Sequence, residues 1–133
     1  MKLAYLIDTD WIIHYLNGNE GIVGNLKELK IEGLSISVVS LAEVYEGIYY
    51  STNPIDNEKG LNDFLTRVSI LGIDNEICKV FGKERGRLRK TKNLIDDFDL
   101  LIASTCLCHK LTLLTNNRKH FEKIDGLKII SFP

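Results

Sequence analysis

Short apolar runs alternate along this chain with segments of helical periodicity, and this alternation is the strongest constraint on its fold. The apolar runs cover residues 3–7, 34–39, 69–73, 111–114 and 127–132. The helical segments between them begin near residues 11, 21, 40, 61, 75, 94 and 116. Strands that alternate with helices form a parallel sheet that helices cover on both faces. We therefore predict a doubly wound parallel β-sheet flanked by helices, an α/β/α sandwich, in a single domain of residues 1–133.

The composition is that of an ordinary soluble globular protein. Hydrophobic residues make up 44% of the chain and charged residues 26%, and the formal net charge is −1. The whole molecule therefore has no general attraction to nucleic acid, and a polyanionic partner would need a local basic patch. The three cysteines have no zinc-site spacing, and no apolar stretch resembles a signal peptide or a membrane span. We expect a cytoplasmic protein with no membrane partner.

Residues 94–106 place three carboxylates, Asp96, Asp97 and Asp99, in the first turn of a helix that is otherwise apolar nearly all round. One of the three is expected to cap the helix, because acidic side chains are favoured at helix N-termini. Three acids exceed what capping needs, and buried carboxylates usually require a cation. We therefore predict an acidic metal site, with Asp99 the acid best suited to a buried position because apolar residues flank it.

Two further acids lie just beyond apolar runs. Asp8 ends the first run, and Glu43 follows the second. Because neighbouring parallel strands end at the same edge of a sheet, where sites form, we predict that both acids converge with the acidic helix. Structural alternatives remain open: Asp8 as a simple turn residue, and Ser40 with Glu43 as a helix capping box. Thr9 or Asp10 is expected to cap the helix that follows Asp8.

Polar side chains also follow the fourth apolar run. Thr115, Asn116 and Asn117 stand there, either as an ordinary turn or as hydroxyl and amide groups that hold a water on a metal ion. The candidate ligands are hard oxygens without histidine or cysteine, a set that suits Mg2+ or Mn2+. Such a cation lowers the pKa of a bound water and orients it for attack on a phosphodiester.

A basic run directly precedes the acidic helix. Residues 83–92 contain six basic side chains and one acidic side chain. Such a run is usually a solvated helix face, but cations beside an acidic metal site also suit a polyanionic substrate held by its phosphates. The predicted phosphate-binding residues are Arg85, Arg87, Arg89, Lys90, Lys92 and Arg118.

Four sequence blocks, in this order and spacing, resemble the PIN domain, and specifically the VapC-type toxins of bacterial and archaeal toxin–antitoxin pairs. The blocks are YLIDTDWII, SVVSLAEVYEG, IDDFDLLIAST and LTLLTNNRKHFEKIDGLKI. The resemblance implies a doubly wound parallel sheet, an acid cluster that binds Mg2+ or Mn2+, and endoribonuclease activity. By position it makes Asp8, Glu43 and Asp99 the catalytic and metal-binding acids. Asn117 stands where many relatives have a fourth acid, and the role of Asp97 as a further ligand is left open.

The same resemblance implies three partners. These are an RNA substrate, a second copy of the chain in a homodimer, and a small cognate antitoxin whose tail lies across the active-site groove. The basic residues named above would then hold the RNA backbone.

Two other functions remain open from the residues alone. Asp8, Thr9 and Asp10 after a strand also match the nucleophile motif of haloacid-dehalogenase-like phosphatases, with Asp8 as the nucleophile, although no convincing lysine motif or cap domain is present. A non-catalytic PIN fold or a receiver-like binding module is the third reading. A receiver would need a phosphoacceptor aspartate closing its third strand, where only Asp74 is near. Metal-dependent RNA cleavage would exclude both binding readings, and a phospho-aspartate on Asp8 would indicate the phosphatase.

Overall fold

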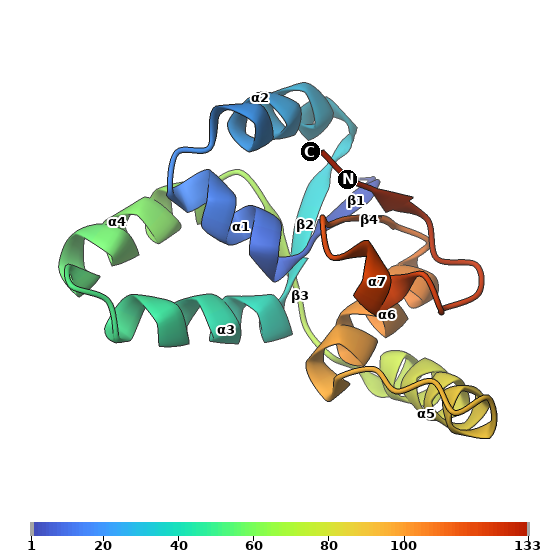
Figure 1. Ribbon diagram of the computed structural model, residues 1–133. Helices are drawn as coiled ribbons and strands as arrows, with labels where there is room; N and C mark the ends of the chain where they lie inside the picture. The colour runs from blue at the N-terminus through green and yellow to red at the C-terminus, as the bar shows by residue number, and fades with distance from the viewer. Residues whose placement is uncertain (1, 133) are drawn as a thin grey trace.

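A five-stranded sheet forms the centre of the protein, in a computed structural model that describes residues 2–132 (Figure 1). The strand order is β3-β2-β1-β4-β5, and every neighbouring pair is parallel. This arrangement confirms the predicted parallel sheet. The strands are β1 (Tyr5–Ile7), β2 (Leu34–Ser37), β3 (Ser69–Leu71), β4 (Thr112–Leu114) and β5 (Ile129–Ile130).

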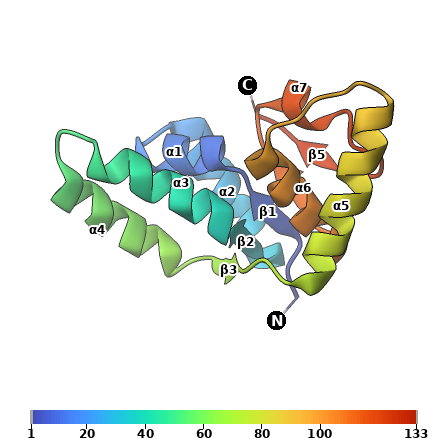
Figure 2. The same ribbon diagram turned by 90° about the horizontal axis from the view of Figure 1, so that it is seen from below.

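Helices cover both faces of the sheet, with α1 to α4 on one side and α5 to α7 on the other (Figure 2). Each side has its own apolar core, one built around Trp11 and Phe64 and the other around Leu100 and Phe121. Within residues 2–132, no helix has the length and apolar character needed to cross a membrane. The helices are α1 (Thr9–Leu16), α2 (Glu20–Leu29), α3 (Val38–Tyr49), α4 (Pro54–Leu65), α5 (Asn75–Lys90), α6 (Asp97–His109) and α7 (Arg118–Phe121), with a 3-10 turn η1 (Lys30–Glu32).

The central strand β1 sets the position of any ligand site. Leu6 and Ile7 are fully buried, because β1 pairs with β2 on one side and β4 on the other while helices cover both faces. From β1 the chain builds the sheet outwards through β2 and β3, and it later returns to the other side of β1 to add β4 and β5. Ligands of such sheets bind beyond the carboxyl ends of the strands where this reversal occurs. That point lies at the ends of β1 and β4.

Helix α3 begins earlier than predicted. We predicted a strand to residue 39 and left a capping box of Ser40 with Glu43 open, but β2 ends at Ser37 and Ser37 itself caps α3 by accepting a hydrogen bond from the Val39 amide. The capping-box reading is therefore wrong. Ser40 and Glu43 both lie inside the helix, so the Glu43 carboxylate is not used in capping.

Helix α4 was missed in its first half. We predicted a helix that begins near residue 61, but the helix begins at Pro54. Asn53 caps it, and proline at the first helical position has a backbone angle already suited to a helix. Only Leu61 and Phe64 of α4 are buried, because the helix packs on α1 and α3 and leaves its other residues towards solvent.

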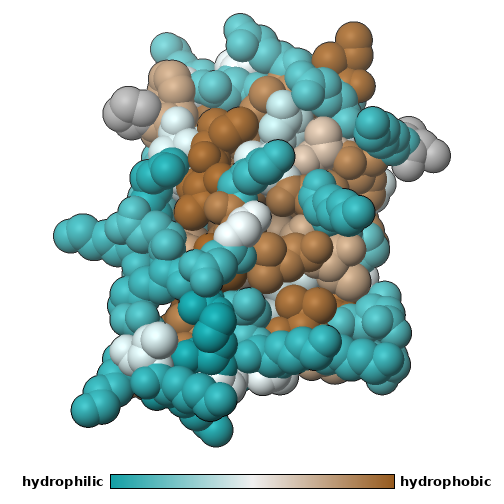
Figure 3. All heavy atoms as spheres, turned by 90° about the vertical axis from the view of Figure 1, so that its right-hand side faces the viewer, coloured by the Kyte–Doolittle hydropathy of each residue, from teal (hydrophilic) through white to brown (hydrophobic). Residues whose placement is uncertain are grey.

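Strand β5 forms one edge of the sheet and is shorter than the predicted run 127–132. Its outer side lies on the face shown in Figure 3, where apolar side chains gather between hydrophilic ones. Ile130 remains 37% exposed at this edge. The run ends early because residues 131–132 leave the strand and bind the end of β4 through side chains.

Candidate active site

Asp8 lies at the carboxyl end of β1 and is only 3% exposed. One oxygen accepts a hydrogen bond from the Thr9 amide, so Asp8 caps α1 in place of the predicted Thr9 or Asp10. The other oxygen accepts a hydrogen bond from Thr115 Oγ1 at 2.7 Å. Burial raises the pKa of Asp8 to about 7, and the negative charges of Asp10 and Asp99 add to the rise, while both hydrogen bonds oppose it.

Glu43 lies on α3 and is linked to Asp8 through one residue. Thr9 Oγ1 donates a hydrogen bond to Glu43 Oε1 at 2.8 Å, while the amide of Thr9 donates to Asp8. Burial raises the pKa of Glu43, and the charges of Asp99 and Asp96 act in the same direction. Thr9 therefore joins the two acids that follow β1 and β2.

Asp99 lies in the first turn of α6 with a side chain that is 20% exposed. Its Oδ2 lies 2.9 Å from Nδ1 of His120 on α7. Burial raises the pKa of Asp99, while His120 opposes that rise and the charges of Asp96 and Asp10 add to it. The link between His120 and Asp99 joins residues 21 positions apart and exists only in the folded chain, so it could not be predicted from the sequence.

The three predicted acids lie at one edge of the sheet, and the charge of Asp99 raises the pKa of both Asp8 and Glu43. Each carboxylate is bound to a threonine or histidine rather than facing the other acids. No three His, Cys, Asp or Glu side chains within residues 2–132 are close enough to hold a metal ion together. Mutual repulsion of like charges favours this spread. The donor set fits Mg2+ or Mn2+ because it consists of hard carboxylate oxygens in an excess of negative charge.

The other two acids of the α6 N-terminus have structural partners. Asp96 is the N-cap of α6, and its side chain accepts a hydrogen bond from the Phe98 amide. Asp97 forms an ion pair with Arg85, and its side chain is 78% exposed. One of the three acids thus acts as the cap, as predicted. The structure does not bring Asp97 together with Asp8 and Asp99.

The end of β4 is tied to the start of α1. The backbone N–H of Asn116 donates a hydrogen bond to Asp10 Oδ2 at 2.9 Å. The side-chain oxygen Oδ1 of Asn116 accepts a hydrogen bond from the indole N–H of the buried Trp11 at 3.0 Å. Asn117, the predicted fourth position, is the residue before α7, and its side chain makes no capping hydrogen bond. Because Thr115 and Asn116 follow a buried strand, the sequence indicates that they lie near the site. It does not show which residues they bind.

We expect Asn116→Ala to lower the free energy of unfolding by about 1–3 kcal/mol, because it leaves the indole N–H of fully buried Trp11 without a partner. It also removes both hydrogen bonds between Asn116 and Phe132. Urea denaturation measures the change. Asn117→Ala is the matched control and should cost less than about 0.5 kcal/mol. Equal losses for the two variants would contradict this role of Asn116.

Two of the predicted phosphate-binding arginines are used inside the protein. Arg85 donates to the Ile95 carbonyl at 3.0 Å besides its ion pair with Asp97. Arg87 pairs with Glu84 and also donates to the Lys123 carbonyl at 3.2 Å. The other predicted cations on and just after α5 are exposed, namely Arg89, Lys90 and Lys92. Arg118 on α7 donates a hydrogen bond to the Ser131 hydroxyl.

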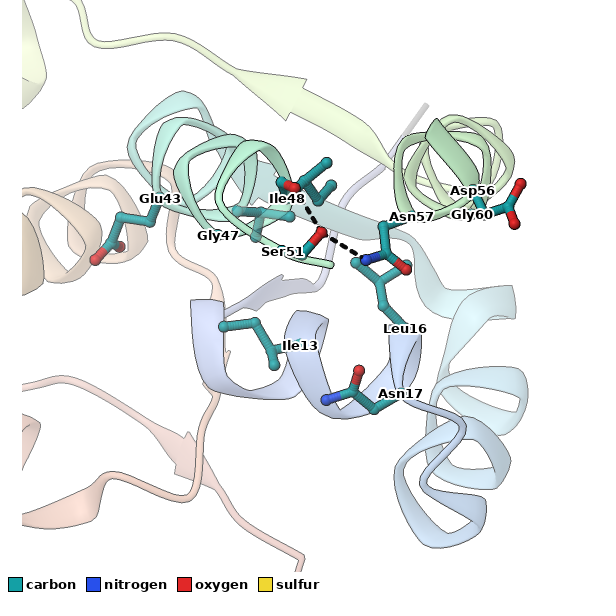
Figure 4. Close-up of a pocket in the computed structure, with 11 residues that line it drawn as sticks. Ile13, Leu16, Asn17, Glu43, Gly47, Ile48, Ser51, Asp56, Asn57 and Gly60 are labelled. Atoms are coloured by element: carbon teal, nitrogen blue, oxygen red, sulfur yellow. Dashed lines mark hydrogen bonds between the residues drawn. The ribbon is translucent and has the colours of Figure 1, made fainter. Parts of the chain in front are cut away.

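A groove of about 270 Å³ runs between α1, α3 and α4 and reaches Glu43 (Figure 4). Its apolar wall comes from α1 and α3, through Ile13, Leu16, Val44 and Ile48. Figure 4 shows the Glu43 side chain extending from α3 at one end of this groove, away from α4. The groove therefore gives an apolar surface that ends at an acid of the site.

Comparisons with known proteins agree with this geometry. The family model described as "PIN domain" matches residues 5–127. The chain is 32% identical over 127 residues to Ribonuclease VapC2 of Rickettsia felis, covering 94% of this chain and 95% of the relative. It is 37% identical over 126 residues to Ribonuclease VapC1 of Methanocaldococcus jannaschii, covering 93% and 85%.

Solved structures show the same relationship. The crystal structure of VapBC2 from Rickettsia felis, bound to a DNA fragment from the promoter, contains a chain that superposes with a TM-score of 0.93 at 28% identity, covering 98% of this chain and 100% of that one. A shared fold over the whole length accompanies the sequence match. The chain therefore belongs to the PIN-domain family and, within it, to the VapC ribonucleases.

Proposed function

We propose that this protein is a metal-dependent endoribonuclease and the toxin of a toxin–antitoxin pair. The observation that carries the proposal is that Asp8, Glu43 and Asp99 lie at the same edge of the sheet, where burial and neighbouring negative charges raise all three pKa values. Such carboxylates suit a divalent cation. Relatives named as ribonucleases support the reaction class.

In this proposal Asp8 and Asp99 hold Mg2+ or Mn2+. When bound, the cation supplies positive charge beside the scissile phosphate and acidifies a water molecule. Thr115 and the Thr9 amide fix both oxygens of Asp8, so its orientation is set before substrate arrives. Glu43, fixed by Thr9 Oγ1, orients the attacking water. Asp97, which is paired with Arg85, is given no role in this site, and Asn117 stays a predicted outer ligand.

The proposal is tested with purified protein and a single-stranded RNA whose products are separated on a gel. We expect cleavage with Mg2+ or Mn2+ and none in EDTA, with activity restored when the ion is returned. Cleavage that persists unchanged in EDTA would contradict the role of the acids. Absence of cleavage under every metal condition would contradict the ribonuclease assignment itself.

The other two readings are not favoured. Asp10, the second acid of a phosphatase motif, accepts a hydrogen bond from the Asn116 amide and is tied to the end of β4. A receiver-like module would need its phosphoacceptor at the end of the third strand. Here β3 is an edge strand, and Asp74 after it caps α5.

We also propose that a cognate antitoxin binds the groove between α1, α3 and α4. The match to a chain of a VapBC complex supports an antitoxin partner. The apolar wall suits an apolar peptide segment, and Glu43 at its end suits a basic side chain. A segment bound there would reach the active site and block it. The homodimer expected from the resemblance stays a prediction, which light scattering of the purified protein tests.

We expect Ile13→Glu to weaken antitoxin binding at least tenfold, because it places a charge on the apolar wall of the groove. Ile13 is 44% exposed, so the fold should tolerate the change. Calorimetric titration with the purified antitoxin measures the affinity. The matched control is Ile31→Glu, at a residue that is 92% exposed on η1. Equal affinity of both variants and wild type would place the antitoxin elsewhere.

A further inference from the structure

A second cavity shares Asp99 with the active site. It has a volume of about 240 Å³ and is lined by residues 94–96, Asp99, Lys119, His120 and Lys123. One wall is therefore the segment that leads into α6, and the opposite wall comes from α7 and the residues just after it. Because Asp99 lies in both places, a molecule in this cavity touches the proposed metal site directly.

Two lysines supply positive charge on the α7 wall. Lys119 and Lys123 are exposed, and neither forms an ion pair with any residue in the described range 2–132. Arg85 and Arg87, by contrast, are paired with Asp97 and Glu84. The cations free to bind a phosphate beside Asp99 are therefore on the α7 side.

The opposite wall carries two apolar residues, Leu94 and Ile95, beside Asp96. Leu94 is 81% exposed although it is a large apolar residue, and the next residue, Ile95, is 8% exposed. On RNA-binding proteins, unstacked bases pack against exposed side-chain surfaces while their phosphates bind nearby cations. This cavity offers both kinds of surface.

Helix α5 braces both walls. Arg85 holds the apolar wall through the Ile95 carbonyl, and Arg87 holds the lysine wall through the Lys123 carbonyl. The two arginines that we predicted from the sequence to bind phosphate therefore fix the geometry of this cavity.

We infer that this cavity binds the nucleotide next to the scissile phosphate, with Lys119 and Lys123 on its phosphate and Leu94 against its base. This inference rests on the proposed ribonuclease function and specifies the substrate of the same site. A base can reach Leu94 only if it is unstacked, so the substrate is single-stranded RNA or a loop.

The test compares Lys119→Ala/Lys123→Ala with Lys27→Ala/Lys30→Ala, a matched pair of exposed lysines on α2 and η1, away from α7 (Figure 1). Cleavage of a single-stranded oligonucleotide is measured across salt concentrations with Mg2+. For the α7 pair we expect KM to rise about tenfold or more while kcat changes less than about threefold. The slope of log KM against log salt should fall by about 0.7–1.4, which corresponds to one or two lost phosphate contacts on a single strand.

Two further variants separate charge and base recognition. Lys119→Arg/Lys123→Arg should restore KM, because the charges return. Leu94→Ala should change the base preference at the cleavage position, which is read by sequencing the product ends. An unchanged melting temperature for the α7 pair shows that the fold is kept.

Each result has one meaning. Wild-type KM and salt slope in the α7 pair, or the same change in the α2 and η1 pair, would overturn the subsite while leaving the ribonuclease proposal standing. Absence of metal-dependent cleavage by the wild-type protein would overturn the proposed function and the subsite together.

Discussion

Asp99→Asn is expected to lower metal-dependent RNA cleavage by about a thousandfold, because it removes one of the two charges proposed to hold the cation at the scissile phosphate. The fold should remain, since asparagine has nearly the same shape and the Asp99 side chain is partly exposed. Steady-state cleavage of a single-stranded RNA measures the loss. Circular dichroism and the melting temperature establish that the variant is folded.

The matched control for this experiment is Asp63→Asn. Asp63 is also an aspartate on a helix with a single charged partner, Arg67, but it lies on α4 and its side chain is 66% exposed. We expect wild-type cleavage from this variant. If Asp99→Asn cuts RNA at the wild-type rate, Asp99 has no part in the mechanism.

In EDTA, the free energy of unfolding is expected to fall as the pH rises from about 4 to about 7. The cause is Asp8, whose pKa is raised from 3.8 to about 7 in the folded protein, mainly by burial. Between these values the folded state binds more protons than the unfolded state, so raising the pH favours unfolding. One pH unit of pKa difference corresponds to about 1.4 kcal/mol, which gives a loss of the order of 2–4 kcal/mol. The raised pKa values of Glu43 and Asp99 act in the same direction.

Urea denaturation at pH 5 and pH 7.5 measures this dependence. Asp8→Asn should flatten it, because asparagine cannot ionise and still caps a helix as well as aspartate does. Added Mn2+ should stabilise the protein more at pH 7.5 than at pH 5, since binding requires deprotonated carboxylates. If the free energy of unfolding in EDTA instead increases with pH over this range, the pKa of Asp8 is not raised in the folded protein.

The fold was predictable because short, mainly apolar strands alternate along the chain with helical segments. Leu6 and Ile7 in β1, for example, have no polar neighbour until Asp8 ends the strand. Helix α4 shows where this signal fails. Its buried residues are few, so its first half has the composition of a loop, and only the Asn53 cap and Pro54 mark its start. Local capping chemistry would have placed that boundary correctly.

The site was predictable only as far as position along the strands allows. Asp8 and Glu43 follow neighbouring strands, which indicates that they lie at one edge of the sheet. Their hydrogen-bond partners come from tertiary structure: the bond of Thr115 to Asp8 spans 107 residues and that of His120 to Asp99 spans 21. No local pattern contains such pairs.

The basic run of residues 83–92 shows that sequence alone also predicts contacts that the folded protein does not offer. Its charges indicated a substrate-binding face, but Arg85 and Arg87 use their guanidinium groups on carbonyls and acids of the protein itself. A count of charges cannot distinguish a free cation from a paired one. The structure moves attention to Lys119 and Lys123, which lie outside residues 83–92 and line the cavity beside Asp99.

The most direct test of the central claim is a crystal structure with Mn2+, read from the anomalous difference map. We predict one strong peak within coordination distance of both Asp8 and Asp99 carboxylate oxygens, about 2.0–2.3 Å from each, with Glu43 beside it. The ion should be absent from crystals of Asp99→Asn grown in the same way. A map with Mn2+ elsewhere on the protein and these carboxylates still bound only to Thr115, Thr9 and His120 would contradict the account.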